Sequence, residues 1–268
     1  MAEKSEKMTK QELSAPDAFQ LYGAEASDWL MKRSQIISTV AVVLVVGGLI
    51  AALVHYFNNR SEEAAAKQLG QTLETLERPV VEGVALQPGP GELPPFKSEK
   101  ERDETTVTEL TKFRTDHKGT EAALTAGLPL GKAQYRLGNY DGALATFEEY
   151  TKEAPKSSAL RISAYEGLGY AHEAKGQLDQ ALEAFKQMGQ AEAGEFMQGM
   201  GQYHQARILV AQGKKDEAAQ LLADLKASQG TSAAGRLATE RLAVLGAQGV
   251  KIPEPKTPPA ANLTPDAG

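Results

Sequence analysis

Residues 128–155 read LPLGKAQYRLGNYDGALATFEEYTKEAP, and two related stretches follow this one along the chain. The second is YEGLGYAHEAKGQLDQALEAFKQMGQAEA over residues 165–193, and the third is YHQARILVAQGKKDEAAQLLADLKASQG over residues 203–230. The three stretches align on their central glycines, at spacings of 38 and 37 residues: Gly138, Gly176 and Gly213. The sequence therefore predicts one structural unit that is used three times.

Each unit predicts two helices joined by a glycine-containing turn. Apolar and small residues recur at three- and four-residue steps on both sides of the glycine, as they do on one face of an α-helix. In the second helix of each unit an alanine precedes a larger apolar residue by four positions, at Ala143/Phe147, Ala181/Phe185 and Ala218/Leu222. A single hairpin of this kind cannot bury its apolar face, so we expect the units to stack into an all-α solenoid.

The residues that precede the three units predict a leading helix pair. Residues 61–77 and 99–117 both show the helical period, and the Pro-rich loop 78–98 separates them. Ser98 and Glu101 have the spacing of a capping box, which opens the second of these helices. We therefore expect a leading unit whose turn has been expanded into the loop.

The residues that follow the three units predict a terminal helix and a tail. Residues 232–245 show the pattern of a capping helix, which we expect Gly246 to end. Residues 247–268 hold several prolines and little apolar material, so we expect an extended linker or a disordered tail. Pro129, near the start of the first unit, is expected to shorten or kink its helix.

The segment from Ile36 to Phe57, IISTVAVVLVVGGLIAALVHYF, is 22 residues long and contains no Asp, Glu, Lys or Arg. A helix of this length covers the roughly 30 Å hydrocarbon core of a bilayer. A cleaved signal peptide has a shorter apolar region and ends at a small-x-small site. We therefore expect a transmembrane helix over residues 36–57 that stays as an anchor, with the repeat domain occupying 58–246.

The charges near the two ends of this segment set its expected orientation. Lys32 and Arg33 precede the segment and Arg60 and Lys67 follow it, so the basic residues beside the two ends are balanced. Three further lysines lie in the tail before it: Lys4, Lys7 and Lys10. They favour a cytoplasmic N-terminal tail, residues 1–35, in which apolar residues at helical spacing predict a helix lying in the headgroup region.

Composition and missing motifs exclude several classes of function. The chain has 29 basic and 35 acidic residues, so it lacks the basic surplus that nucleic-acid binding requires, and it has no cysteine. His172-Glu173 is not followed by the second histidine of a zinc-protease motif. Gly131-Lys132-Ala133 lacks the spacing and the hydroxyl of a phosphate loop. We therefore expect no enzyme, no cofactor, no metal site and no small-molecule substrate.

The units resemble the tetratricopeptide repeat, which has Leu-Gly or Leu-Ala in its first helix, Gly in the turn, and Ala and Phe or Tyr in its second helix. The first unit matches best, from Leu130-Gly131 to Pro155. A tail with PDAF and DWL, one anchor and a repeat domain with AYEGLGYAHEAKGQLDQALEAF further resemble the YfgM-like ancillary subunits of the bacterial SecYEG translocon. That resemblance implies an inner-membrane protein whose periplasmic repeats meet the translocon, periplasmic chaperones or secreted chains.

The same resemblance implies where a partner binds, because the first helices of tetratricopeptide units line a concave groove. The implied groove residues are Lys132, Tyr135, Glu166, Tyr170, Glu173, Tyr203 and Arg207. Tyrosines among charges of both signs suit a protein-binding surface. The alternative is that these rings only pack between neighbouring units.

Two functional hypotheses follow, and both are non-enzymatic. The first is a membrane-anchored module that binds protein partners in the cell envelope, as a periplasmic adaptor or chaperone-linked subunit near the secretion translocon. The second is an envelope scaffold, a cell-division or wall-assembly coordinator, that oligomerises through its repeats. A cytosolic receptor is a third interpretation, which requires the opposite orientation in the membrane.

Overall fold

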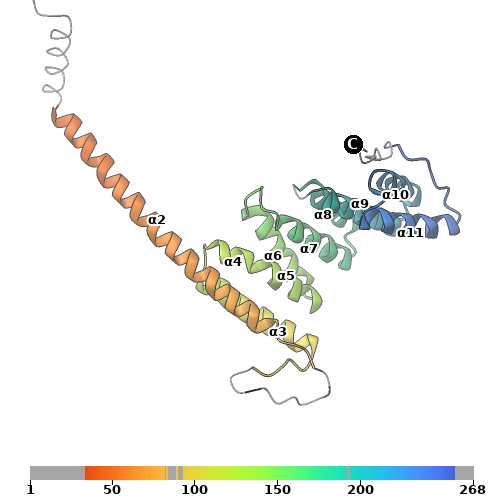
Figure 1. The fold of residues 1–268 in the computed structure, drawn as a ribbon, viewed down its shortest axis with the longest axis horizontal. Coiled ribbons are helices and arrows are strands. Elements are labelled where there is room, and N and C mark those ends of the chain that lie inside the picture. The colour runs from red at the N-terminus through yellow and green to blue at the C-terminus, as the bar shows by residue number, and fades with distance from the viewer. Residues whose placement is uncertain (1–33, 82, 84–88, 90–92, 192–193, 257–268) are drawn as a thin grey trace, which may run out of the picture. The chain divides into compact units, whose positions relative to one another are not determined.

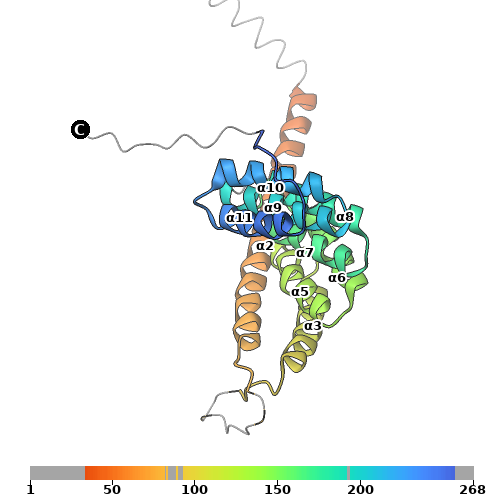
Figure 2. The same ribbon diagram turned by 90° about the vertical axis from the view of Figure 1, so that its right-hand side faces the viewer.

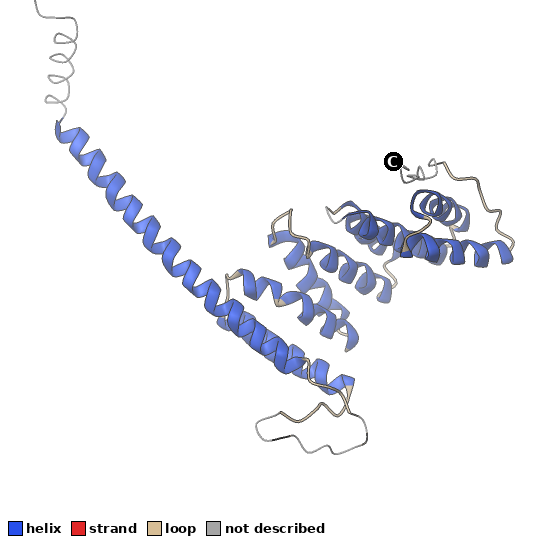
Figure 3. Cartoon of the chain, viewed as in Figure 1, coloured by secondary structure: helices blue, strands red, loops and turns tan. Residues whose placement is uncertain are grey.

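The computed structural model describes residues 34–81, 83, 89, 93–191 and 194–256. Within these residues the regular structure is helical, apart from one isolated β-bridge (Figures 1 and 3). The all-α fold class predicted from the sequence is therefore confirmed. The chain divides into two compact units, Met1–Arg60 and Ser61–Gly268.

The described part of the first compact unit belongs to helix α2, Ser34–Leu76, which also supplies the first residues of the second compact unit. Every large apolar side chain between Val43 and Phe57 is at least 48% exposed to solvent. The helix from Val43 to Leu76, which begins with this segment, is long and apolar enough to cross a membrane. The helix expected in the N-terminal tail lies outside the described residues.

The leading helix pair forms as expected. Residues 61–76 of α2 pack against α3, Glu99–Asp116, in a core that includes Leu69, Leu110 and Phe113. The capping box is confirmed, because Ser98 Oγ accepts from the Glu101 amide at 3.1 Å. The Glu101 carboxylate accepts from the amide of Lys97, the residue before the cap, at 2.7 Å, so the reciprocal bond is shifted by one residue from that of a standard capping box.

The Pro-rich loop is closed at its base. Val80 and Phe96 form the isolated β-bridge, and the Phe96 ring is buried in the core of the leading pair. The Arg78 guanidinium lies over this ring at 4.1 Å and donates to the Pro94 carbonyl at 2.9 Å. The two ends of the loop are thus joined to the helical core.

Three helical hairpins follow, which we call units 1, 2 and 3 (Figure 1). Unit 1 is α5, Gly127–Arg136, with α6, Tyr140–Glu153; unit 2 is α7, Arg161–Ala174, with α8, Leu178–Gln190; unit 3 is α9, Gly194–Ala211, with α10, Lys215–Gln229. The short helix α4, Glu121–Thr125, precedes α5. The break between α4 and α5 agrees with the effect expected of Pro129, whose ring clashes with the carbonyl four residues earlier.

The turns of the three units share one geometry. Their glycines have φ values of 79°, 72° and 79°, in the left-handed region that a glycine enters without steric cost: Gly138, Gly176 and Gly213. In unit 1 the amide after the glycine, that of Asn139, donates to the Gln134 carbonyl at 2.9 Å. The equivalent amides of units 2 and 3 make the same bond at 2.9 Å. This bond satisfies a carbonyl that the end of the helix leaves free.

The C-terminal helix α11, Ala233–Ala247, ends in a fourth turn of the same kind. Gly249 has φ 85° and the Val250 amide donates to the Leu245 carbonyl at 3.0 Å. The expectation that Gly246 ends the helix was wrong, because Gly249 is the left-handed residue. Helix α11 packs against α9 and α10 and, with its glycine turn, resembles the first helix of a further unit (Figure 2).

The residues that follow α11 lie against α10. Residues 251–256 form no helix, and prolines at 253 and 255 are incompatible with one. This segment is held on α10, where Gln220 donates to the Glu254 carbonyl at 3.2 Å and the Asp224 carboxylate accepts from the Lys256 amide at 2.5 Å. The rest of the tail, 257–268, lies outside the described residues.

The core between units is built from aromatic rings placed against glycines. Phe147 of α6 is 1% exposed, and Cβ atoms added at Gly131 and Gly167 would lie only 2.7 and 2.4 Å from its ring. Phe185 of α8 is fully buried, and a Cβ at Gly169 would lie 2.5 Å from its ring. The glycines of the first helices therefore make room for a ring from the second helix.

Candidate partner-binding groove

The residues predicted to line the groove come from α5, α7 and α9, and their positions are best counted back from the turn glycine of each unit. Three residues stand six positions before it: Lys132, Tyr170 and Arg207. Tyr135 and Glu173 stand three positions before it. Neighbouring units contact each other through positions that are not equivalent. Tyr135 of unit 1 contacts Tyr170 of unit 2, and Glu173 of unit 2 contacts Arg207 of unit 3.

The contact between units 1 and 2, which we call the first seam, is aromatic on the groove side. The rings of Tyr135 and Tyr170 lie 6.4 Å apart, and the Tyr140 ring lies 5.5 Å from that of Tyr135. All three side chains are half-buried. This arrangement leaves part of each ring in contact with solvent, where a partner can bury it.

The contact between units 2 and 3, the second seam, is ionic at the equivalent positions. Glu173 forms an ion pair with Arg207, and both side chains are about 70% buried, with exposed fractions of 27% and 30%. The Arg207 guanidinium also lies over the Tyr170 ring at 5.5 Å. One arginine thus binds a carboxylate and a tyrosine ring together.

His204 of α9 is a residue of the second seam that sequence reasoning missed. It is 5% exposed, its ring stacks on Phe185 at 4.8 Å with an interplanar angle of 24°, and its Nε2 lies 3.4 Å from the Tyr170 hydroxyl. Burial, together with the charge of Arg207, lowers the pKa of His204 to about 4, against an opposing effect of Glu173. The signal in the sequence was positional, since His204 and Gly167 both stand nine residues before their turn glycines.

Tyr170 lies at the centre of the groove and also touches the core. Its ring meets Phe185 edge-on at 5.4 Å, so it packs between units as well as facing the groove. Burial raises the pKa of Tyr170, and the charge of Glu166 raises it further. Both interpretations of this tyrosine, as groove residue and as packing residue, therefore describe part of its surroundings.

Two other predicted residues lie near this centre. Glu166 is half-buried on α7, one helical turn before Tyr170. Tyr203 is half-buried on α9, with its ring 5.6 Å from that of His204. The structure therefore brings six of the seven predicted residues to the two seams.

The seventh, Lys132, lies at a different place. It is exposed and lines a concavity of about 340 Å³ with Leu73 and Leu76 of α2 and with Pro129. Arg136 lines the same concavity and donates to the buried Asp103 carboxylate of α3 at 2.8 Å. This hydrogen bond raises the pKa of Arg136. Lys132 thus belongs to the contact between unit 1 and the leading pair.

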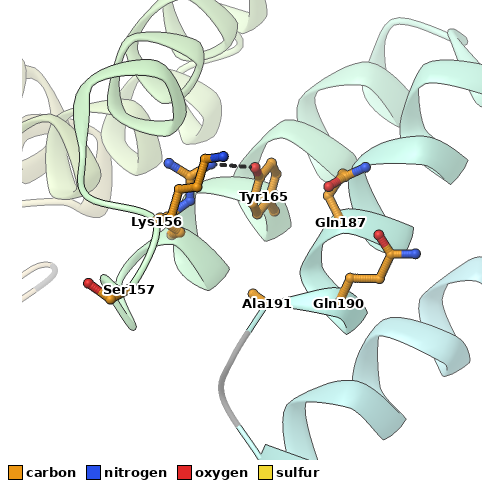
Figure 4. Close-up of a pocket in the computed structure, with 7 residues that line it drawn as sticks. Lys156, Ser157, Tyr165, Gln187, Gln190 and Ala191 are labelled. Carbon is orange, nitrogen blue, oxygen red and sulfur yellow. Dashed lines mark hydrogen bonds between the residues drawn. The ribbon is translucent and has the colours of Figure 1, made fainter.

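A larger concavity, about 590 Å³, opens where unit 1 is joined to unit 2 (Figure 4). Most of the residues that line it have a polar group in the side chain, and they include Lys156, Tyr165 and Gln187. Arg161 also lines it, but this arginine donates to the Tyr165 hydroxyl at 2.7 Å and to the Ala154 carbonyl at 3.0 Å. Because these bonds hold Arg161 in the loop structure, we assign this concavity to the connection between units.

Comparison with known proteins agrees with this architecture. A family model described as a tetratricopeptide repeat-like domain matches residues 28–218. The match includes all the predicted groove residues, and α11 lies beyond it. No curated protein matches the chain.

Proposed function

This chain belongs to the tetratricopeptide repeat-like domain family, and we propose that it is a membrane-anchored module that binds a segment of a partner protein in the groove of its first helices. The observation that carries the proposal is the half-buried cluster of Tyr135, Tyr140 and Tyr170 beside the Glu173–Arg207 pair. Rings that are half exposed and fixed by their neighbours offer contact area at a low entropic cost, as in other protein-binding surfaces.

The finer proposal concerns where the module works. The exposed apolar surface from Val43 to Phe57 supports a membrane anchor. We place this anchor in the bacterial inner membrane, with the N-terminal tail cytoplasmic and the repeats periplasmic, because of the lysines in the tail and the family resemblance. The resemblance to YfgM-like subunits adds a role near the secretion translocon, with the translocon, chaperones or secreted chains as partners. The alternative of an envelope scaffold predicts a stable oligomer of the purified chain, whereas the adaptor is expected to be a monomer.

The proposed groove can be tested by photo-crosslinking from the full-length chain in its native membrane. A photoreactive phenylalanine analogue at Tyr135 is expected to capture a partner protein, because this position lies in the ring cluster. The matched control is the same analogue at Glu148, which is exposed on α6 and faces neither seam. Capture that is equal at both positions, or that occurs only at 148, would contradict the groove proposal.

The proposed orientation can be tested with a single cysteine, since the chain has none. Lys100 is a suitable site because its side chain is 76% exposed, whereas Ser98 caps α3 and should be kept. In intact spheroplasts we expect Lys100→Cys to react with a membrane-impermeant maleimide. Labelling that appears only after lysis would place the repeats in the cytosol.

A further inference from the structure

Glu166 is the carboxylate of the groove whose charge has no partner in the part of the chain that the structure describes. It is half-buried, and none of the hydrogen bonds or ion pairs of the described residues involves its side chain. The other groove carboxylate, Glu173, is neutralised by Arg207. Lys132 faces the concavity beside the leading pair. The ring cluster is therefore left with one uncompensated negative charge.

Glu166 lies beside the rings because of its place on α7. Residues four apart on a helix are neighbours on its surface, so Glu166 and Tyr170 leave the same face of α7. The effect of this charge on the pKa of Tyr170, which is second only to burial, agrees with that proximity. Tyr135 and Tyr140 continue the cluster on the other side of Tyr170.

The second seam shows that an arginine side chain can bind a carboxylate and a tyrosine ring together. Arg207 binds Glu173 and lies over the Tyr170 ring at 5.5 Å. At the first seam the position equivalent to Arg207 is occupied by Tyr170 itself, so this position carries no cation that could pair with Glu166. A guanidinium is attracted both by the negative face of an aromatic ring and by a carboxylate.

We infer that Glu166, Tyr135 and Tyr170 form a subsite for an arginine side chain of the partner segment. This inference rests on the proposed function and deepens it, because it states which residue of the partner the groove selects. The ring cluster supplies the stacking surface and Glu166 the countercharge. The planar guanidinium uses both, whereas a lysine ammonium gains less from stacking, so arginine is expected to be preferred over lysine.

The experiment is a selection of random twelve-residue peptides displayed on phage against the full-length chain in nanodiscs. Among the retained peptides, arginine is expected to rise about threefold or more above its frequency in the library, next to aromatic or aliphatic residues. The same selection is made with Glu166→Gln, for which the arginine enrichment is expected to disappear. Glu148→Gln is the matched control, since it changes the net charge equally at an exposed position of α6.

A synthetic copy of the most enriched peptide then gives the affinity by fluorescence anisotropy. Glu166→Gln is expected to weaken binding about three- to tenfold, and Tyr135→Leu by a similar factor, while Tyr135→Phe keeps the ring and the affinity. Peptides retained without arginine enrichment, or with enrichment that persists in Glu166→Gln, would overturn this inference and leave the proposed groove intact. If no peptide is retained in a way that depends on Tyr135, the proposed function fails and the inference fails with it.

Discussion

Phe147 and Phe185 occupy the same position in successive units, yet the two seams that they fill are closed differently. The Phe147 ring fits between two glycines, one from its own unit and one from the next, Gly131 and Gly167. The Phe185 ring has the equivalent glycine of its own unit, Gly169, but meets the imidazole of His204 on the other side. The groove sides of the two seams differ as well, since Tyr135 contacts Tyr170 at the first seam and Glu173 pairs with Arg207 at the second.

The comparison shows that both seams bury a phenylalanine ring, while the side chains that surround the ring differ in polarity and charge. Both seams enclose a ring that is at most 1% exposed, so both gain the burial of a large apolar side chain. At the first seam the groups against the ring and the two tyrosines on the groove side are uncharged. The second places a titratable imidazole and an ion pair around its ring, and we therefore expect it to respond to pH and salt.

The largest expected effect concerns what the seams share. Phe147→Ala and Phe185→Ala should each lower the free energy of unfolding by about 3 to 5 kcal/mol, because each leaves a cavity in a packed interior. Urea denaturation of the full-length chain in detergent, followed by circular dichroism, measures the loss. Hydrogen exchange should show opening of α5 and α7 in the first variant and of α7 and α9 in the second. Unchanged denaturation midpoints in both variants would mean that these rings do not hold the units together.

The second prediction is that the stability of the second seam depends on pH, because this seam contains a buried histidine. A histidine in the unfolded chain has a pKa near 6.5, whereas that of the buried His204, which faces Tyr170, Glu173 and Arg207, is about 4. Between these values the unfolded chain binds a proton that the folded chain does not, so stability falls as the pH falls. From pH 7.5 to pH 5.0 the loss should be about 2 kcal/mol.

Comparison with His204→Phe isolates this contribution, since a phenyl ring keeps the stacking on Phe185 but cannot take up a proton. The wild-type chain should lose about 2 kcal/mol more than this variant over the same pH range. An equal loss in the two proteins would show that the imidazole titrates alike in the folded and unfolded chains. The second seam would then be no more sensitive to pH than the first.

The smallest expected effect is a difference between the seams in how salt changes the coupling energy of the two residues that meet on the groove side. A double-mutant cycle with Glu173→Gln and Arg207→Met should give a coupling energy of about 0.5 to 1 kcal/mol for this partly exposed pair. The coupling should decrease in 0.5 M NaCl because mobile ions screen it. The matched cycle at the first seam, Tyr135→Leu with Tyr170→Leu, should give a coupling that salt leaves unchanged. Equal salt dependence of the two couplings would remove the distinction drawn between the seams.

Local patterns in the sequence determined much of this fold. The helical periods, the turn glycines and the capping box at Ser98 each act within a few residues, so they can be identified without knowledge of the neighbours in space. The same holds for the apolar segment, which is defined by composition alone. The expected helices 36–57 and 61–77 are parts of one helix, because α2 continues through residues 58–60. No glycine or proline interrupts it there, and the change in polarity marks a change of surroundings rather than a helix end.

The contacts between units were decided only by the tertiary structure. The repeat pattern predicts that Lys132, Tyr170 and Arg207 are equivalent, and so they are by position. Which residue of the next unit each one meets depends on how neighbouring helices cross and on the connections between them, and neither is encoded in a local period. For this reason the structure brings Tyr135 to Tyr170 and His204 into the core, whereas Lys132 meets the leading pair. The residues after Gly249 are a further case, since their hydrogen bonds to α10 join parts of the chain 32 to 34 residues apart.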